Sequence, residues 1–234
     1  DDAGVDVRLS TRVCVEDLTE FDEVVLATGV TPRIPDVPGI DHPKVVTYLD
    51  VLRDHVPVGS TVAIMGAGGI GFDVAEYLTQ SGPSATVTPD RFYQEWGIDS
   101  SYQNRGGLTD VALEAPARAV TLLQRKTSKV GGGLGKTTGW IHRTELKKRG
   151  VRMVPGVTYE RIDDDGLHMT LDDQPVLLDA ETIVICTGQE PQRELLDGLQ
   201  DAGVSVHVIG GADVAAELDA KRAIKQGTEV AAAL

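Results

Sequence analysis

Short apolar runs that alternate with amphipathic stretches give the chain its dominant pattern. The apolar runs are typical of strands that are buried on both faces of a parallel sheet. The best-defined runs lie at 24–27, 61–65, 120–124, 182–186 and 204–209. Amphipathic stretches predict helices at 48–55, 70–80 and 137–149 and from Asp213 to the C-terminus. Strands and helices that alternate in this way predict an α/β fold.

Weaker patterns occupy the rest of the chain. Two or three shorter strands are predicted at 151–154, 159–163 and 167–171. The acidic stretch Asp163–Gly166 between two of them predicts a hairpin turn in preference to a metal site. Residues 32–43 hold four prolines and predict an irregular link. Residues 81–118 have weak periodicity and predict a long irregular insertion, a kind of segment that is usually functional or mobile.

A glycine fingerprint follows the second buried run directly. Gly66, Gly68 and Gly71 match G-x-G-x-x-G between a strand and a helix. The first glycine permits a tight turn, the second lets the backbone approach a pyrophosphate, and the third allows close packing of helix on strand. The helix N-terminus then presents unpaired N–H groups to the phosphates. The sequence therefore predicts a dinucleotide site.

The choice between NAD and NADP depends on the end of the strand that neighbours the fingerprint. By spacing, Asp90 follows a short run at 85–88 and would bind a ribose hydroxyl, which suits NAD. The run at 120–124 is a better strand, and it ends in Arg125 and Lys126 without an acid, which suits a 2′-phosphate. We favour the run at 120–124 over the run at 85–88, and hence NADPH over NAD. The alternative for Arg125 and Lys126 is that they simply form a solvated loop.

A second glycine cluster at 131–135 precedes Lys136. It does not form a P-loop, because Val130 stands where that motif requires glycine. Lys136 is nevertheless a candidate contact to the same phosphate, with a merely structural loop as the open alternative.

An internal repeat suggests how the chain is organised. Residues 22–32 and 181–191 each contain a buried run, a Thr-Gly turn and a proline three residues beyond the glycine. Two such units on either side of the fingerprint predict two related cofactor domains, one inserted in the other. The predicted parts are 1–56, 57–189 and 190–234, of which the outer two form one domain. Gly211 and Asp213 follow a strand in the last part and are candidates for a second cofactor contact or an ordinary helix cap.

Composition narrows the possible partners and the possible roles of the cysteines. A net charge of −14 argues against nucleic acid as a partner, and no apolar run is long enough to cross a bilayer. Cys14 and Cys186 form no C-x-x-C motif, so we interpret both as small buried hydrophobes in a cytoplasmic protein, with a long-range disulfide left open. The chain begins in loop-like sequence at Asp1, and we expect it to be a piece of a longer protein.

Taken in order, these motifs resemble those of the flavoproteins with two dinucleotide-binding domains. The motifs are Val25–Gly29, Gly66–Gly71, Ile185–Gly188 and Gly211–Asp213. Longer stretches resemble the C-terminal half of the bacterial NADPH-dependent 2,4-dienoyl-CoA reductases, and they lie at 41–53, 124–129, 133–143 and 163–168. The resemblance implies an α/β fold: a three-layer Rossmann-like NAD(P)-binding domain, with a parallel and a small antiparallel sheet, inserted in a truncated FAD-binding domain.

The same resemblance implies an electron path and site residues. In that family NADPH passes hydride to FAD, and electrons continue through a 4Fe-4S cluster to FMN and a dienoyl-CoA of unsaturated fatty-acid β-oxidation. The barrel domain that holds FMN, the cluster and the substrate, and the first FAD glycine loop, are missing from this chain and are expected to precede Asp1. The implied NADPH contacts are Gly66, Gly68, Gly69, Ile70 and Gly71 on the pyrophosphate, Arg125 and Lys126 on the 2′-phosphate, and Thr187 and Gly188 near the nicotinamide. The implied FAD contacts are Thr28, Gly29, Gly211, Asp213 and Ala223.

Two functions follow as expectations. The first is the NADPH-to-FAD module of an oxidoreductase, which needs no acid, base or metal ligand from this chain because the cofactors carry the chemistry. The second is a non-catalytic NADP(H)-binding fragment without bound flavin.

Overall fold

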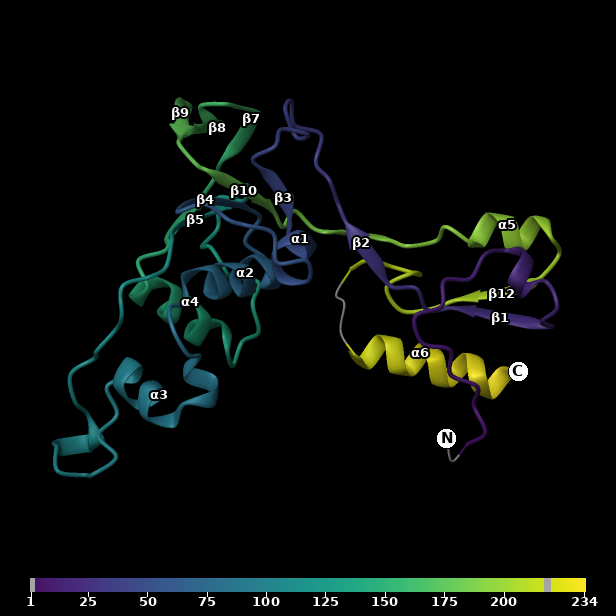
Figure 1. The fold of residues 1–234 in the computed structure, drawn as a ribbon, viewed down its shortest axis with the longest axis horizontal. Coiled ribbons are helices and arrows are strands. Elements are labelled where there is room, and N and C mark those ends of the chain that lie inside the picture. The colour runs from purple at the N-terminus through teal and green to yellow at the C-terminus, as the bar shows by residue number, and fades with distance from the viewer. Residues whose placement is uncertain (1–2, 217–219) are drawn as a thin grey trace. The chain divides into compact units, whose positions relative to one another are not determined.

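A computed structural model describes residues 3–216 and 220–234 (Figure 1). The chain forms two compact units, one of residues 32–188 and one of residues 1–31 with 189–234. The larger unit therefore begins at residue 32, not at 57 as the sequence predicts, because β3 (Val45–Thr47) pairs with β10 (Thr182–Ile185) of that unit. Which unit serves which cofactor remains a prediction.

A parallel sheet of five strands forms the centre of the larger unit. Its order is β3-β10-β4-β5-β6, with β4 at Thr61–Met65, β5 at Ala119–Gln124 and β6 at Arg152–Pro155. Met65 pairs with Leu123 and with Ile185, so the carboxyl ends of β4, β5 and β10 lie at one edge of the sheet. The inner strand β4 is fully apolar from Val62 onward and is buried on both faces, as its sequence predicts.

Helices cover one face of this sheet and a second sheet covers the other. The helices are α1 (Tyr48–Leu52), α2 (Gly69–Thr79) and α4 (Gly139–Lys148), and their core includes Phe72, Leu78, Leu122 and Leu146. On the other face lies an antiparallel sheet of β7 (Thr158–Asp163), β8 (Gly166–Leu171) and β9 (Gln174–Leu178). Their side chains share a core with Met65 and Ile183. The predicted α/β fold with a parallel and a small antiparallel sheet is confirmed (Figure 1).

The smaller unit is built around two parallel strands, β1 (Glu23–Leu26) and β12 (Ser205–Val208). Its helices are η1 (Glu16–Leu18), α5 (Leu196–Asp201) and α6 (Ala220–Ala233), and β2 (Val30–Pro32) pairs with β11 (Gln189–Pro191) at the point where the chain passes between the units. The prediction that residues 24–27 are buried on both faces is wrong. Val25 is 41% exposed, because β1 has β12 as its one strand partner among the described residues and only the Val24 and Leu26 face packs on a core.

The predicted irregular insertion contains more structure than its sequence suggests. Within 81–118 lie η2 (Ala85–Val87), the eight-residue helix α3 (Pro89–Trp96) and η3 (Arg105–Gly107). Proline at the first position of α3 and Gly97 in the left-handed conformation at its end supply the local start and stop signals. The short run at 85–88 is therefore not a strand, and Asp90 lies in the first turn of α3.

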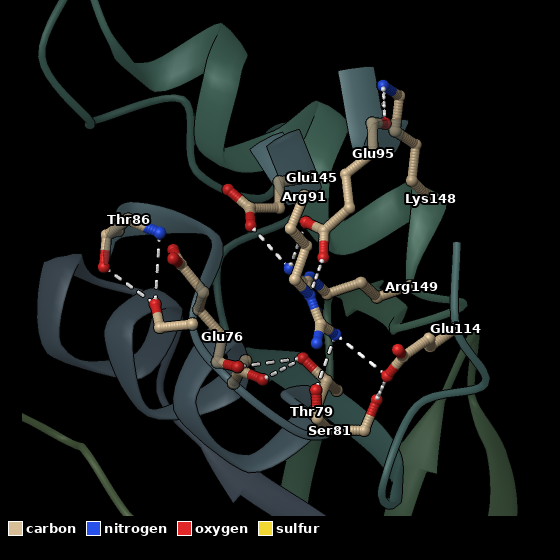
Figure 2. A network of polar contacts seen from close by, with 12 residues as sticks. Glu76, Thr79, Ser81, Thr86, Arg91, Glu95, Glu114, Glu145, Lys148 and Arg149 are labelled. Atoms are coloured by element: carbon tan, nitrogen blue, oxygen red, sulfur yellow. Dashed lines mark hydrogen bonds and ion pairs between the residues drawn. The ribbon is translucent and has the colours of Figure 1, made fainter. Parts of the chain in front are cut away.

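Buried ion pairs attach α3 to α4 (Figure 2). Glu95 has a side chain that is 8% exposed, and it lies 2.9 Å from Arg91 and 3.1 Å from Arg149. Arg91 also meets Glu114, and Arg149 also meets Glu145. Lys148 lies over the ring of Trp96, 4.1 Å from its centroid. These contacts hold α3, whose sequence has only weak periodicity, against α4 of the larger unit.

Replacing Glu95 with glutamine is therefore expected to loosen α3. The amide keeps the shape of the side chain but leaves Arg91 and Arg149, whose side chains are 13% and 9% exposed, without that carboxylate, which disfavours the docked state. Amide hydrogen exchange in α3 should accelerate by about tenfold, since docking governs local opening there. Glu114→Gln is the matched control, because the Glu114 side chain is 62% exposed and such pairs contribute little. Equal exchange rates in both variants would contradict the assigned role of Glu95.

Candidate dinucleotide site

The glycine fingerprint forms the turn that the sequence predicts. Gly66 has φ of +111°, and a Cβ there would lie 2.2 Å from the carbonyl oxygen of Cys186. A Cβ on Gly71 would lie 2.0 Å from the carbonyl oxygen of Gly66, so glycine is needed for α2 to approach the turn. Around Gly68 and Gly69, by contrast, no atom of the described residues, apart from close neighbours in the chain, lies within 4 Å of the added Cβ position. The first and third glycines thus serve packing, and the middle of the loop borders open space.

The N-terminus of α2 faces that space without a side-chain cap. Gly68 is the N-cap residue and has no side chain to accept a hydrogen bond from the first turn. Unpaired N–H groups and the positive end of the helix dipole make such a terminus suited to anions. The backbone around Gly68 therefore fits the close approach of a phosphate group.

A cavity of ≈ 440 Å³ opens over the loop. Such a volume lies within the range of small-molecule sites, about 300–1,000 Å³. Its walls come from the ends of β4, β5 and β10, the glycine cluster after β5, and the first part of β7. They are formed by Gly66, Ala67, Gly68, Gly69, Gln124, Arg125, Lys126, Ser128, Lys129, Gly132, Gly133, Leu134, Tyr159, Cys186, Thr187 and Gly188.

The charge of this cavity is opposite to that of the whole chain. Arg125, Lys126 and Lys129 line it, while no aspartate or glutamate is among its lining residues. The chain as a whole carries a net charge of −14. Three cations beside an uncapped helix N-terminus are the chemistry that recognises a ligand with several phosphates.

One wall is fixed by Arg33. Its backbone N–H donates to the Gly188 carbonyl at 3.0 Å, its guanidinium donates to the Thr187 carbonyl, and its own carbonyl accepts from the Thr187 hydroxyl at 2.8 Å. Gly188 has φ of +116° and leaves this wall without a side chain. Thr187 and Gly188 therefore line a wall that Arg33 holds in place, and their position beside the nicotinamide stays a prediction.

Two buried groups lie in the same cavity wall. Burial raises the pKa of the Cys186 thiol to about 12, so this cysteine stays a neutral, apolar thiol. Among the described residues the buried Tyr159 hydroxyl donates to no hydrogen-bond partner; burial raises its pKa, and the nearby backbone N–H of Gly66 lowers it. A buried hydroxyl beside the glycine loop that donates to no described residue fits a site where a polar ligand accepts its hydrogen bond.

Most predicted dinucleotide contacts meet at this cavity. Gly66, Gly68, Gly69, Arg125, Lys126, Thr187 and Gly188 line it. Ile70 and Gly71 lie behind the loop in the first turn of α2, and Lys136 is exposed outside the lining residues. Asp90, the alternative ribose contact, is outside the lining as well, because its segment is helical.

Several lining residues were not predicted. Gln124 and Ser128 belong to the end of β5 and its loop, where the pairing of neighbouring strand ends would point to them. Tyr159 comes from the antiparallel sheet, and no local motif marks it.

The predicted FAD contacts gather at the carboxyl ends of β1 and β12. The Thr28 hydroxyl donates to the Gln192 carbonyl at 2.6 Å, and a Cβ on Gly211 would lie 3.2 Å from Gly29. Asp213 accepts from the Gln226 side chain at 2.7 Å, which connects this loop to α6. A Cβ on Gly210 would lie 3.6 Å from that of Ala223. The arrangement brings the named residues together, and their role toward a flavin stays a prediction.

The remaining sequence features are structural. Asp163–Gly166 is the turn of the β7–β8 hairpin, as predicted. Asp163, Asp165 and His168 have ligand atoms within 4.8 Å of one another, but Arg161 and His168 already engage the Asp163 carboxylate. Cys186 is buried as expected, whereas Cys14 is exposed, because Val15 and Leu18 are the residues of its segment that pack against the core of the smaller unit; both thiols are free. Among the described residues, no helix is long and apolar enough to cross a membrane.

Comparison with known proteins finds reductases among the relatives of this chain. A metal reductase of Desulforamulus reducens is 25% identical over 217 residues, which are 90% of this chain and 31% of the relative. A cinnamate reductase of Clostridium sporogenes is 40% identical over 88 residues, which are 37% of this chain and 13% of the relative. The chain thus spans about a third or less of the length of these relatives.

Solved structures show the same fold. A 2-naphthoyl-CoA reductase in complex with 2-naphthoyl-CoA superposes with a TM-score of 0.74 at 21% identity, covering 97% of this chain and 29% of that one. The 6-hydroxypseudooxynicotine amine oxidase of Pseudomonas geniculata superposes with a TM-score of 0.70 at 20% identity, covering 94% and 30%. The family model of the pyridine nucleotide-disulphide oxidoreductases matches residues 2–223. Because that match covers nearly the whole chain, the protein belongs to the pyridine nucleotide-disulphide oxidoreductase family.

Proposed function

We propose that the chain is the NADPH-binding module of a larger flavoenzyme and passes hydride from NADPH to FAD. The observation that carries this proposal is the cavity over Gly66–Gly71, with three cations and no acid in its lining. NAD(H) would need an acceptor for its ribose hydroxyls at the end of β5, and Gln124 stands there in place of a carboxylate. Arg125 and Lys126 follow at once and suit a 2′-phosphate.

In this function the residues of the cavity bind and orient the cofactor. The glycine loop and the N-terminus of α2 hold the pyrophosphate, and the cations hold the 2′-phosphate. Thr187 and Gly188 leave a flat wall for the nicotinamide, fixed by Arg33. The cofactors supply the hydride chemistry, so the protein contributes position and electrostatics without an acid or base. Thr28, Gly29, Gly211, Asp213 and Ala223 would contact the FAD from the smaller unit.

We further propose that the whole protein reduces a 2,4-dienoyl-CoA. The resemblance of the long stretches at 41–53, 124–129 and 133–143 supports this substrate class, as does the fold shared with a reductase of another CoA thioester. The barrel domain with FMN, the 4Fe-4S cluster and the substrate site would then lie outside this chain. NADPH oxidation by the full-length protein should depend on added 2,4-dienoyl-CoA; strict dependence on cinnamate or a metal ion instead would contradict this assignment.

A second candidate function is an NADP(H)-binding fragment that holds no flavin. The exposed face of β1 favours it, because Val25 lies uncovered at 41% exposure beside the residues assigned to FAD. An absorbance spectrum of the purified chain separates the two candidates. Flavin bands near ~450 nm that bleach with NADPH support the first function. A colourless chain that binds NADPH supports the second, and a chain that binds neither NADPH nor NADH contradicts both.

A further inference from the structure

The side chain of Gln124 lies at the end of β5 and turns back into the loop that follows. Its amide Nε2 lies 2.9 Å from the Lys126 carbonyl oxygen and 2.7 Å from the Ser128 carbonyl oxygen. An amide nitrogen has two N–H donors and a carbonyl oxygen has none, so these two acceptors fix which end of the amide faces the loop. Gln124 thus holds two backbone carbonyls of a loop that contains no regular structure.

The opposite side of this loop carries the cations of the cavity. Arg125, Lys126 and Lys129 are all exposed, and all three line the cavity. The Lys126 carbonyl also accepts from the backbone N–H of Gly156 at 3.1 Å, and the Gln124 carbonyl accepts from Val157 at 3.1 Å. The carbonyls are therefore directed toward Gln124 and the β6–β7 turn, which leaves the charged side chains free to face the cavity.

We propose that Gln124 is a positioning residue that gives this cavity its preference for a dinucleotide carrying a 2′-phosphate. The inference rests on the proposed binding of NADPH at the cavity. Gln124 acts through the loop, not by contact with the reacting atoms. A loop held in one conformation loses less conformational freedom when its cations bind a phosphate, so its preorganisation adds to affinity. A ligand without the 2′-phosphate does not use these cations and gains little from their placement.

Two substitutions at position 124 separate the loss of the hydrogen bonds from a change of charge. Glutamate there would place a carboxylate oxygen beside two carbonyl oxygens, three acceptors with no donor among them. The loop would have to open, and the cavity would lose part of its positive charge. Methionine has nearly the same length and flexibility but donates no hydrogen bond, so Gln124→Met removes the two bonds without adding charge.

The test compares the binding of NADPH and NADH to the purified chain by calorimetric titration. Gln124→Met is expected to raise the Kd for NADPH on the order of tenfold, the effect of losing two neutral hydrogen bonds that hold a binding loop. The Kd for NADH should change by less than about twofold, since the pyrophosphate loop is untouched. Hydrogen exchange at 125–129 should accelerate while α2 stays protected. Gln124→Glu should weaken NADPH binding further.

A double-mutant cycle then shows whether Gln124 acts through the cations. In the background Arg125→Ala with Lys126→Ala, Gln124→Met should add less than about a twofold loss, because the groups that it positions are gone. An undiminished loss in that background, or equal losses for NADPH and NADH, would overturn the inference. Unchanged NADPH binding by Gln124→Met would overturn the inference alone. A wild-type chain that does not bind NADPH would overturn the proposed function as well.

Discussion

Gly68→Val is expected to abolish tight binding of the dinucleotide while leaving the fold intact. Within the part of the chain that the structure describes, the added Cβ meets no atom within 4 Å apart from its immediate chain neighbours. Gly68 has φ of −82° and ψ of −172°, an extended conformation that valine favours. Its methyl groups would occupy the space that the pyrophosphate must enter. Loss of the charge-assisted bonds to the helix N-terminus should raise the Kd for NADPH by about 100-fold or more. Calorimetric titration measures this change.

Gly71→Val is the matched control from the same glycine fingerprint. Its Cβ would lie 2.0 Å from the Gly66 carbonyl oxygen, so this variant should fail through the fold. Thermal unfolding should show a large drop for Gly71→Val and only the cost of a poorer N-cap, about 1 kcal/mol, for Gly68→Val. If Gly68→Val kept wild-type affinity for NADPH, the glycine loop would not be the pyrophosphate site.

The paired substitution Arg125→Ala with Lys126→Ala should weaken NADPH binding on the order of 100-fold, because two charge-assisted contacts to the 2′-phosphate are lost. NADH lacks that phosphate, and its Kd should change by no more than about threefold, the share of general electrostatics. The wild-type preference for NADPH should also fall as salt is raised, since these side chains are exposed to solvent.

Lys136→Ala is the control for charge alone. Lys136 carries the same charge but lies outside the lining residues of the cavity, so its removal should leave NADPH affinity within about twofold of wild type. Equal losses of NADPH and NADH in the paired variant would contradict the phosphate assignment. A large loss in Lys136→Ala would show that the loop after the second glycine cluster reaches the ligand.

The parts of the fold that could be predicted are those with strong local signals. The run Thr61–Met65 ends in the fingerprint, and the two together predict a strand, a tight turn and a helix, which the structure contains. The choice of β5 over the run at 85–88 also followed from local composition, since a longer apolar run makes the better inner strand. From these signals the sequence predicts that Arg125 and Lys126 lie near the glycine loop, and both line the same cavity as that loop.

The parts that could not be predicted depend on distant contacts. Helix α3 has a weakly apolar sequence, and it is stabilised by Arg149, a residue 54 positions beyond Glu95. Tyr159 lines the cavity from the antiparallel sheet, which covers the face of the parallel sheet that the helices leave open. The sequence around Tyr159 shows only a strand pattern. Val25 lies in an apolar run, yet its burial depends on neighbours that the run itself does not specify.

The most direct test of the account is a calorimetric titration of the wild-type chain with NADPH and, separately, with NADH. A single site should bind NADPH more tightly than NADH by about tenfold or more, as expected when exposed cations contact one additional phosphate. An absence of binding by NADPH, or tighter binding by NADH, would contradict the central claim that the cavity over Gly66–Gly71 is an NADPH site.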